Sequence, residues 1–321
     1  MKLIIQIPCY NEENTLADVL ADLPRKIEGI SKIETLIIND GSTDKTVEVA
    51  RKHGVSHIFS FKKNKGLAYG FKTGLDKSLM LGADIVVNTD ADNQYCGADI
   101  VKLVAPIVKG ESDIVIGCRP IDQIKDFSWI KKKLQKIGSK TVRLFSHTNV
   151  PDATSGFRAF SREAALRINV YSHYTYTLET LIQAGDANMK LSYVPIRVNP
   201  KTRESRLLKS IPRYLLFSIM TIIRISVFYR PLRYFFTIGA SSCLLGVCIG
   251  IRFLYFYCTG NGAGHIQSLI LTSVLLSVGF QFIMFGFLAD IVATNRKISE
   301  DIQYRIRSMQ IAGYQKSTLQ E

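Results

Sequence analysis

Two acidic side chains follow a short apolar stretch in the first third of the chain. The first half of residues 84–94 is apolar and β-branched, which predicts a buried strand, and Asp90 and Asp92 come directly after it. Residues two apart in extended backbone point to the same side, so both carboxylates can face one ligand. Paired oxygen donors suit Mg²⁺ or Mn²⁺, above all when the ion also holds a diphosphate. A strand-ending turn with solvated aspartates is the alternative interpretation.

Alternating strands and helices would position this turn. Short apolar runs predict strands over residues 3–7, 33–38, 55–61, 84–88 and 113–117. Helical patterns lie between them, and Asn11 or Asn14 is the expected cap of the first helix. The alternation indicates an α/β fold with a mostly parallel, Rossmann-like sheet and helices on both faces. Polar clusters at 8–13, 39–44 and 90–94 would then share the carboxyl edge of the sheet, where such folds bind ligands.

Composition narrows the class of protein. The 321 residues carry a formal net charge of +14, which favours an anionic partner. The six cysteines form no C-x-x-C pair, so a zinc site or a disulfide framework is not expected. The sequence holds neither G-x-G-x-x-G nor the phosphate-binding G-x-x-x-x-G-K-[ST] pattern. No nucleic-acid partner is expected, because basic residues cluster beside apolar runs instead of spreading over a soluble face.

The last third of the chain predicts a membrane anchor. Residues 234–258 and 266–289 are apolar runs long enough to span a bilayer, and Ser242, Gly246 and Gly250 form a small-residue face for helix packing. Basic flanks place both termini in the cytosol and the connector outside. Residues 125–146 and 201–233 are basic and amphipathic, as interfacial helices are. Two buried core helices, and a solvated helix at 125–146, are the alternatives.

The order of the polar motifs resembles a known enzyme family. Pro8-x-Tyr10-Asn11-Glu12, Asn39-Asp40-Gly41-Ser42-x-Asp44, Asn64-x-Gly66 and Asp90-Ala-Asp92-x-Gln94 are spaced as in family-2 glycosyltransferases of the GT-A fold. Asp152-Ala-Thr-Ser-Gly156-Phe-Arg158 and Arg203-Glu-Ser-Arg206 resemble dolichyl-phosphate mannose synthase and the bacterial polyprenyl-phosphate hexosyltransferases. The sequence lacks the Gln-x-x-Arg-Trp of processive synthases, which favours transfer of a single sugar.

The resemblance, which covers roughly residues 1–210, and the apolar runs that follow together imply a domain plan and a location. Residues 1–205 would be a cytosolic GT-A domain, 206–232 juxtamembrane amphipathic helices, 233–292 a two-helix transmembrane hairpin and 293–321 a cytosolic tail. The protein would be integral to a bacterial or archaeal cell membrane, or to an ER-type membrane. A homo-oligomer is left open.

The resemblance also assigns roles in binding the sugar donor, a UDP- or GDP-hexose. The residues expected to line the nucleotide and diphosphate site are Pro8, Tyr10, Glu12, Asp40, Asp90 and Ala91. Asp90, Asp92 and Gln94 would hold Mg²⁺ or Mn²⁺. Many relatives have a second Asp where this chain has Asn39, but Asp40 still supplies a carboxylate.

Three further residues are expected to act in catalysis. Arg119 and Arg206 are candidate phosphate clamps, since guanidinium pairs bidentately with phosphate, and surface arginines are the alternative. The family motif makes Asp152 a catalytic residue. A polyprenyl phosphate acceptor is already ionised, so Asp152 could orient Arg158, the metal or the acceptor instead of removing a proton.

The predicted activity is therefore inverting transfer of one sugar from a nucleotide diphosphate sugar to a polyprenyl phosphate, dolichyl or undecaprenyl, at the cytosolic face of a membrane. One alternative is another lipid acceptor, such as a ceramide, a diacylglycerol or a lipid-linked oligosaccharide. The other is a catalytically silent scaffold that binds lipid through its basic surface.

Overall fold

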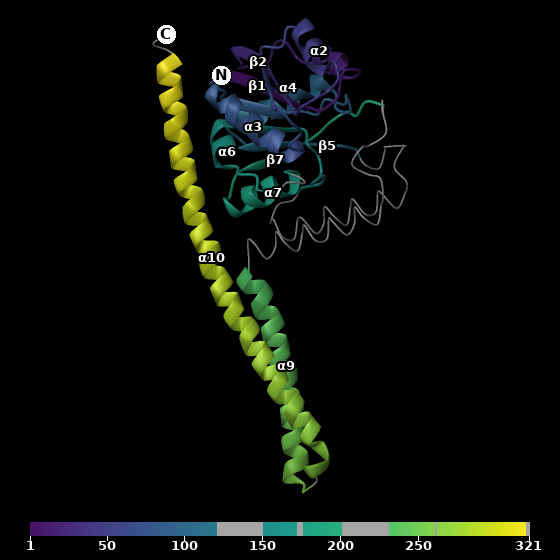
Figure 1. Ribbon diagram of the computed structural model, residues 1–321, viewed down its shortest axis with the longest axis vertical. Coiled ribbons are helices and arrows are strands. Elements are labelled where there is room, and N and C mark those ends of the chain that lie inside the picture. The colour runs from purple at the N-terminus through teal and green to yellow at the C-terminus, as the bar shows by residue number, and fades with distance from the viewer. Residues whose placement is uncertain (121–149, 172–175, 201–230, 261, 319–321) are drawn as a thin grey trace. The chain divides into compact units, whose positions relative to one another are not determined.

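The computed structural model describes residues 1–120, 150–171, 176–200, 231–260 and 262–318 (Figure 1). The chain divides into two compact units, Met1–Ile211 with Gln303–Glu321, and Pro212–Ile302. The amphipathic segments expected at 125–146 and 206–232 lie outside the described residues, apart from the last two positions of the second.

A seven-stranded mixed sheet forms the centre of the first unit. Its order is β3-β2-β1-β4-β6-β5-β7, and only β6 runs antiparallel to its neighbours β4 and β5. The strands are β1 (Lys2–Cys9), β2 (Lys32–Asn39), β3 (His57–Ser60), β4 (Ile85–Asn88), β5 (Ile114–Cys118), β6 (Arg158–Ser161) and β7 (Leu191–Pro195). The expected α/β class and its mostly parallel sheet are confirmed.

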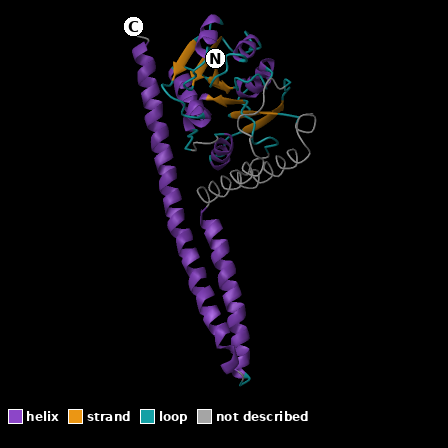
Figure 2. Cartoon of the chain, turned by 45° about the vertical axis from the view of Figure 1, so that its right-hand side comes forward, coloured by secondary structure: helices purple, strands orange, loops and turns teal. Residues whose placement is uncertain are grey.

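Helices cover both faces of this sheet, as Figure 2 shows for the purple and orange elements. Ile4 and Val86 belong to one hydrophobic core and Ile5 and Val87 to another, because successive strand residues point to opposite faces. The first core packs against α3 (Leu67–Met80), α6 (Arg162–Arg167) and α7 (Thr177–Asp186). The second packs against α1 (Leu16–Ala21), α2 (Thr46–Lys52) and α4 (Ile100–Val108), which follows the short helix η1 (Gly97–Asp99).

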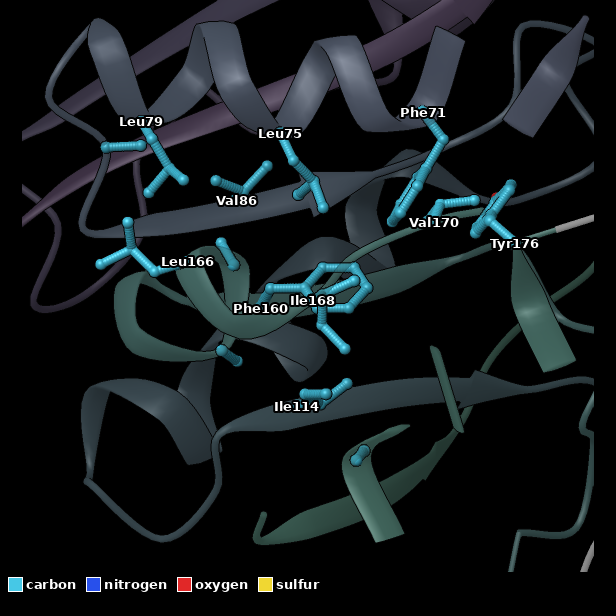
Figure 3. Packing of buried hydrophobic residues seen from close by; sticks show 14 of the residues in the cluster. Phe71, Leu75, Leu79, Val86, Ile114, Phe160, Leu166, Ile168, Val170 and Tyr176 are labelled. Atoms are coloured by element: carbon cyan, nitrogen blue, oxygen red, sulfur yellow. The ribbon is translucent and has the colours of Figure 1, made fainter. Parts of the chain in front are cut away.

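Helix α3 fixes the first core through one apolar stripe. Phe71, Leu75 and Leu79, spaced by four, point at the sheet beside Phe160, and Phe71 stacks on Tyr176 with ring centroids 3.9 Å apart (Figure 3). All five side chains are essentially inaccessible to solvent. Full burial of one such side chain stabilises the fold by about 1.5–3 kcal/mol, so the stripe anchors the helix firmly.

The topology brings three strand ends together. The chain runs outward from β1 to β2 and β3, then returns to place β4 on the other side of β1. Carboxyl ends beside such a reversal of strand order form the ligand crevice of open α/β sheets. Gln6 of β1 pairs with Asn88 of β4, and Cys9 pairs with Asn39 of β2, so the polar turns after these strands emerge on one edge.

The first helix begins differently from the sequence expectation. Thr15, not Asn11 or Asn14, precedes α1, and no side chain caps its first turn. Asn11 instead adopts φ of 55°, and its amide oxygen accepts a hydrogen bond from the Thr43 N–H at 2.8 Å. The expected cap is therefore wrong, because Asn11 ties the β1 turn to the β2 turn.

The end of the long helix α10 (Ile266–Thr318) packs on the sheet domain from Gln303 onward. Ile311 is buried in the first core, and the Tyr304 hydroxyl lies 3.0 Å from the Glu163 carboxylate. Arg307 donates from Nε to Asp76 of α3 at 2.7 Å and from Nη1 to three carbonyl oxygens at the end of α6, at 3.0 to 3.3 Å. The segment expected to be a polar tail thus joins α3 to α6.

The second unit contains α9 (Pro231–Cys258), the short helix η3 (Gly262–His265) and α10 as far as Ile302. The two long helices are each long and apolar enough to cross a membrane. Many of their large apolar side chains are exposed, unlike those of core helices. Ser242 donates to the Leu275 carbonyl oxygen at 2.9 Å, and a side chain on Gly246 or Gly250 would meet α10 at Leu275 or Thr272, 3.1 to 3.2 Å away. The predicted small-residue packing face is confirmed.

Candidate active site

The acidic turn lies directly after β4. Asp90 and Asp92 are half-buried, and Ala91 between them is buried. The Ala91 carbonyl accepts the Thr15 hydroxyl at 2.7 Å, and Asp92 Oδ1 accepts the Gln94 main-chain N–H at 3.1 Å. Burial and the neighbouring charge of Asp92 raise the pKa of Asp90 to about 7. The negative charge of one carboxylate therefore makes ionisation of the other unfavourable.

This donor set fits a divalent cation. Within the described ranges, no three His, Cys, Asp or Glu side chains gather as a metal cluster. Mg²⁺ is commonly bound by one or two carboxylates together with water and substrate phosphates, so Asp90 and Asp92 suffice. A cation between them would offset the repulsion that raises the Asp90 pKa. The place of Gln94 as a third ligand stays a prediction, since its hydrogen bond to Asp92 is made by the main-chain N–H.

The turn after β1 faces the same place. Glu12 is buried, its main-chain N–H donates to the Thr46 hydroxyl at 2.9 Å, and its carboxylate accepts the Thr15 hydroxyl at 3.0 Å. The same hydroxyl oxygen lies 2.7 Å from the Ala91 carbonyl oxygen, so its single proton is shared between the two acceptors and Thr15 joins the two turns. Pro8 is half-buried, whereas Tyr10 is 40% exposed. That these two residues line a nucleotide site stays a prediction.

Asp40, at the end of β2, holds the loop that opens α3. It is buried, and its two oxygens accept the main-chain N–H groups of Lys65 at 2.7 Å and Gly66 at 2.9 Å. Gly41 lets this loop approach, since a Cβ there would lie 2.8 Å from the Asn64 nitrogen and the residue has φ of +71°. A contact of Asp40 with a base or ribose stays a prediction.

A buried ion pair interacts electrostatically with the acidic turn. Arg119 follows β5 and donates from Nε to Asp152 Oδ2 at 2.7 Å and from Nη2 to Oδ1 at 3.0 Å. The Thr154 hydroxyl donates to the same Oδ1 at 3.0 Å. Burial opposes ionisation of Asp152, but the Arg119 charge and these hydrogen bonds outweigh it and hold the Asp152 pKa below its usual value. Asp152 is therefore an ionised anchor for Arg119.

The charges of this pair and of the acidic turn affect each other's pKa values. The charge of Arg119 lowers the Asp90 pKa, and that of Glu12 raises it. For Arg119 itself, burial lowers the pKa, but the surrounding Tyr95, Asp152 and Asp90 raise it above its ordinary value. The site thus combines one guanidinium with several carboxylates that affect one another's pKa, an arrangement suited to a substrate that brings both phosphate and metal.

Other predicted residues lie elsewhere. Arg158 is fully buried and donates to the carbonyl oxygens of Ser155, Ala153 and Thr177, at 2.8 to 3.0 Å. It therefore fixes the loop that carries Asp152, and it is Arg119 that Asp152 orients. Arg206 lies outside the described residues, so its role as a phosphate clamp stays a prediction.

Several residues that build the site were not singled out by sequence reasoning. Thr15 and Tyr95 lie on the turns that flank the acidic pair, and Asn88 and Tyr176 lie behind it. The usable signal was Asn88, a polar residue at the end of an otherwise apolar strand. A fully buried amide needs partners, so its presence predicts a polar network under the site.

Comparisons with known proteins agree with this geometry. The mixed sheet, with its Asp-x-Asp turn after β4, has the GT-A fold of sugar-transferring enzymes. Residues 4–168 match the family model described as glycosyl transferase family 2, and the chain belongs to this family.

Relatives extend the match along the chain. An uncharacterized protein of Methanocaldococcus jannaschii is 33% identical over 208 residues, which are 61% of this chain and 81% of the relative. UDP-N-acetylglucosamine–dolichyl-phosphate N-acetylglucosaminyltransferase of Methanococcus voltae is 30% identical over 213 residues, 60% of this chain and 83% of that enzyme. Glucosyl-3-phosphoglycerate synthase of Mycobacterium tuberculosis, solved with Mn²⁺ and uridine diphosphate, shares the fold with a TM-score of 0.53, at 19% identity over 69% of this chain and 79% of that one.

Proposed function

We propose that this protein transfers one sugar from a nucleotide diphosphate sugar to a polyprenyl phosphate, with inversion at the anomeric carbon, at the cytosolic face of a membrane. The observation that carries the proposal is the state of Asp152. Both of its oxygens accept hydrogen bonds from Arg119 or Thr154, and its pKa is lowered, so it is poorly suited to remove a proton. A site without a base at this position suits an acceptor whose oxygen is already charged, as a phosphate is.

The remaining residues fit the same reaction. Asp90 and Asp92 would hold Mg²⁺ or Mn²⁺, which when bound neutralises charge on the departing diphosphate. Arg119, held by Asp152, brings a positive charge close enough to lower the Asp90 pKa, and the same charge would stabilise a phosphate. Glu12 and Asp40 fix the turns between which the nucleotide would lie. The acceptor phosphate oxygen would attack the anomeric carbon from the face opposite the diphosphate.

The second unit supports a lipid acceptor. Its two helices are long and apolar enough to span a bilayer, and a relative is named for transfer to dolichyl phosphate. Residues 303–318 pack on the same domain that precedes α9. A chain that crosses the bilayer with both helices would therefore begin and end on one side, in agreement with the basic flanks. Anchoring would concentrate a lipid substrate beside a soluble donor.

A panel of donors tests the proposal. Membranes containing the chain are incubated with polyprenyl phosphate and labelled UDP- or GDP-sugars, and chloroform-soluble, acid-labile product is counted. Product from one donor supports the proposal and names the sugar. Product only with a ceramide or diacylglycerol supports a different lipid acceptor, and no product with any donor supports a lipid-binding scaffold.

A further inference from the structure

Three polar side chains lie buried inside the first unit, behind the acidic turn that follows β4. Gln6 of β1 and Asn88 of β4 have no exposed surface, and Tyr176 is 1% exposed. Gln6 Nε2 donates to Asn88 Oδ1 at 2.9 Å, and Asn88 Nδ2 donates to the Tyr176 hydroxyl at 2.9 Å. A buried amide is costly unless its hydrogen bonds are made, and here both ends of the Asn88 amide are satisfied.

This network ends on the main chain of one residue, Gly156, at its carbonyl oxygen and its N–H. Asn88 Nδ2 donates to the Gly156 carbonyl oxygen at 2.9 Å, and the Tyr176 hydroxyl lies 3.4 Å from the same oxygen. On the other side, the Gly156 N–H donates to the Tyr95 hydroxyl at 3.1 Å. Each tyrosine ring is itself fixed by stacking, Tyr176 on Phe71 and Tyr95 on the residue after Gly156. The glycine is held from both faces by rigid groups.

Gly156 lies against the Asp90 carboxylate. A Cβ on Gly156 would be 3.2 Å from Asp90 Oδ2, 3.4 Å from Oδ1 and 2.7 Å from the Tyr176 oxygen. Both carboxylate oxygens therefore face bare main chain, with no room for a side chain between them and the tyrosine. The position of this peptide limits the orientations that Asp90 can adopt.

We propose that Asn88, Tyr95 and Tyr176 are positioning residues for glycosyl transfer, which hold the Gly156 peptide against Asp90 and so fix this carboxylate for the divalent cation. The inference deepens the proposed function and rests on it for the identity of the reaction. None of these three side chains needs to contact the substrate. Their effect passes through Gly156, as outer groups around metal ligands set the ligand geometry.

The experiment uses the full-length chain and the variants Tyr176→Phe and Asn88→Leu. Phenylalanine keeps the stack on Phe71 and removes only the hydroxyl. Tyr304→Phe is the matched control, because it removes a tyrosine hydroxyl that contacts Glu163 on the surface. Binding of Mn²⁺, in the presence of UDP and separately of GDP, is followed by the loss of the free-ion electron paramagnetic resonance signal. Melting temperature and the kcat and KM for the donor at saturating Mn²⁺ are measured in parallel.

Tyr176→Phe should weaken Mn²⁺ binding roughly 10-fold, as loss of an outer partner of a metal ligand does, while the control leaves it unchanged. The donor KM at saturating Mn²⁺ should stay within about twofold. Unchanged Mn²⁺ affinity, with activity falling only as the melting temperature falls, would show a merely structural network and overturn the proposal.

A second variant keeps the proposal falsifiable if Asn88→Leu does not fold. Gly156→Ala places a methyl group against the Tyr176 hydroxyl, so Gly156→Ala combined with Tyr176→Phe should bind Mn²⁺ no more weakly than Gly156→Ala alone. If the double variant lost Mn²⁺ affinity by the product of the two single losses, the result would contradict coupling through Gly156. Because Mn²⁺ binding is read without turnover, the proposed reaction could fail while this inference stands.

Discussion

The variants Asp152→Asn and Arg119→Gln test whether Asp152 holds Arg119 in place or acts as a general base. The pair is bidentate, at 2.7 and 3.0 Å, and the two side chains are 1% and 9% exposed. Breaking a buried ion pair by removing one partner costs about 3–5 kcal/mol. The asparagine keeps the shape and can retain one acceptor, so we expect the lower end, about 3 kcal/mol. If that energy is lost in the transition state, the rate falls about 100-fold, since about 1.4 kcal/mol is a factor of ten.

The assay is the initial rate of lipid-linked product formation in a double-mutant cycle. Each single variant breaks the same ion pair. The rate of the double variant should therefore also fall about 100-fold, and not by the product of the two single losses. The dependence of the rate on pH should keep its shape in Asp152→Asn, because no proton transfer is assigned to this residue. Multiplying effects of the two substitutions, or loss of the acidic limb in Asp152→Asn alone, would refute the anchor role.

Two further predictions concern stability. Arg307→Met removes charged hydrogen bonds to Asp76 and to the end of α6 and should lower the free energy of unfolding by about 2–4 kcal/mol. Thermal melting would show this loss of stability. An equal effect of Arg305→Met, at an exposed position, would refute the role of Arg307 in joining α10 to α3 and α6. For Glu34, burial opposes ionisation, but hydrogen bonds from three basic neighbours lower its pKa to about 2 from 4.5. A carboxylate whose pKa is lower in the folded state stabilises the fold at pH values above its unfolded-state pKa, and this stabilisation is lost as the pH falls. Glu34→Gln should therefore lower the free energy of unfolding by about 1 kcal/mol near neutrality, after allowance for screening by solvent. The difference between wild type and variant should close between about pH 5 and pH 2. A constant difference over that range of pH would contradict this.

The strands and their ends were predictable because the signals are local. The runs ending at Ile7, Ile38 and Asn88 are apolar and stop at polar turns, and their parallel pairing follows from the helices between them. The acidic turn could be assigned for the same reason. The strands β6 and β7 were not predicted, since the antiparallel insertion of β6 between β4 and β5 depends on pairing across a long stretch of chain.

Several of the contacts that orient the site join residues distant in sequence. Arg119 pairs with Asp152 33 residues away, and Asn88 reaches Gly156 68 residues away. Arg307 contacts Asp76 across 231 residues. Motif spacing names such residues but does not say which side chains meet, because that is decided by tertiary packing.

The acceptor chemistry tests the central claim most directly. The rate of sugar transfer is compared for a polyprenyl phosphate and for the corresponding polyprenol, the same lipid without its phosphate, with Asp92→Ala as the control for metal-dependent turnover. The proposed site predicts product from the phosphate alone, and none from Asp92→Ala although this variant still reaches the membrane. Transfer to the free alcohol at a comparable rate, or full activity in Asp92→Ala, would contradict a mechanism built on a charged acceptor and a metal-bound leaving group.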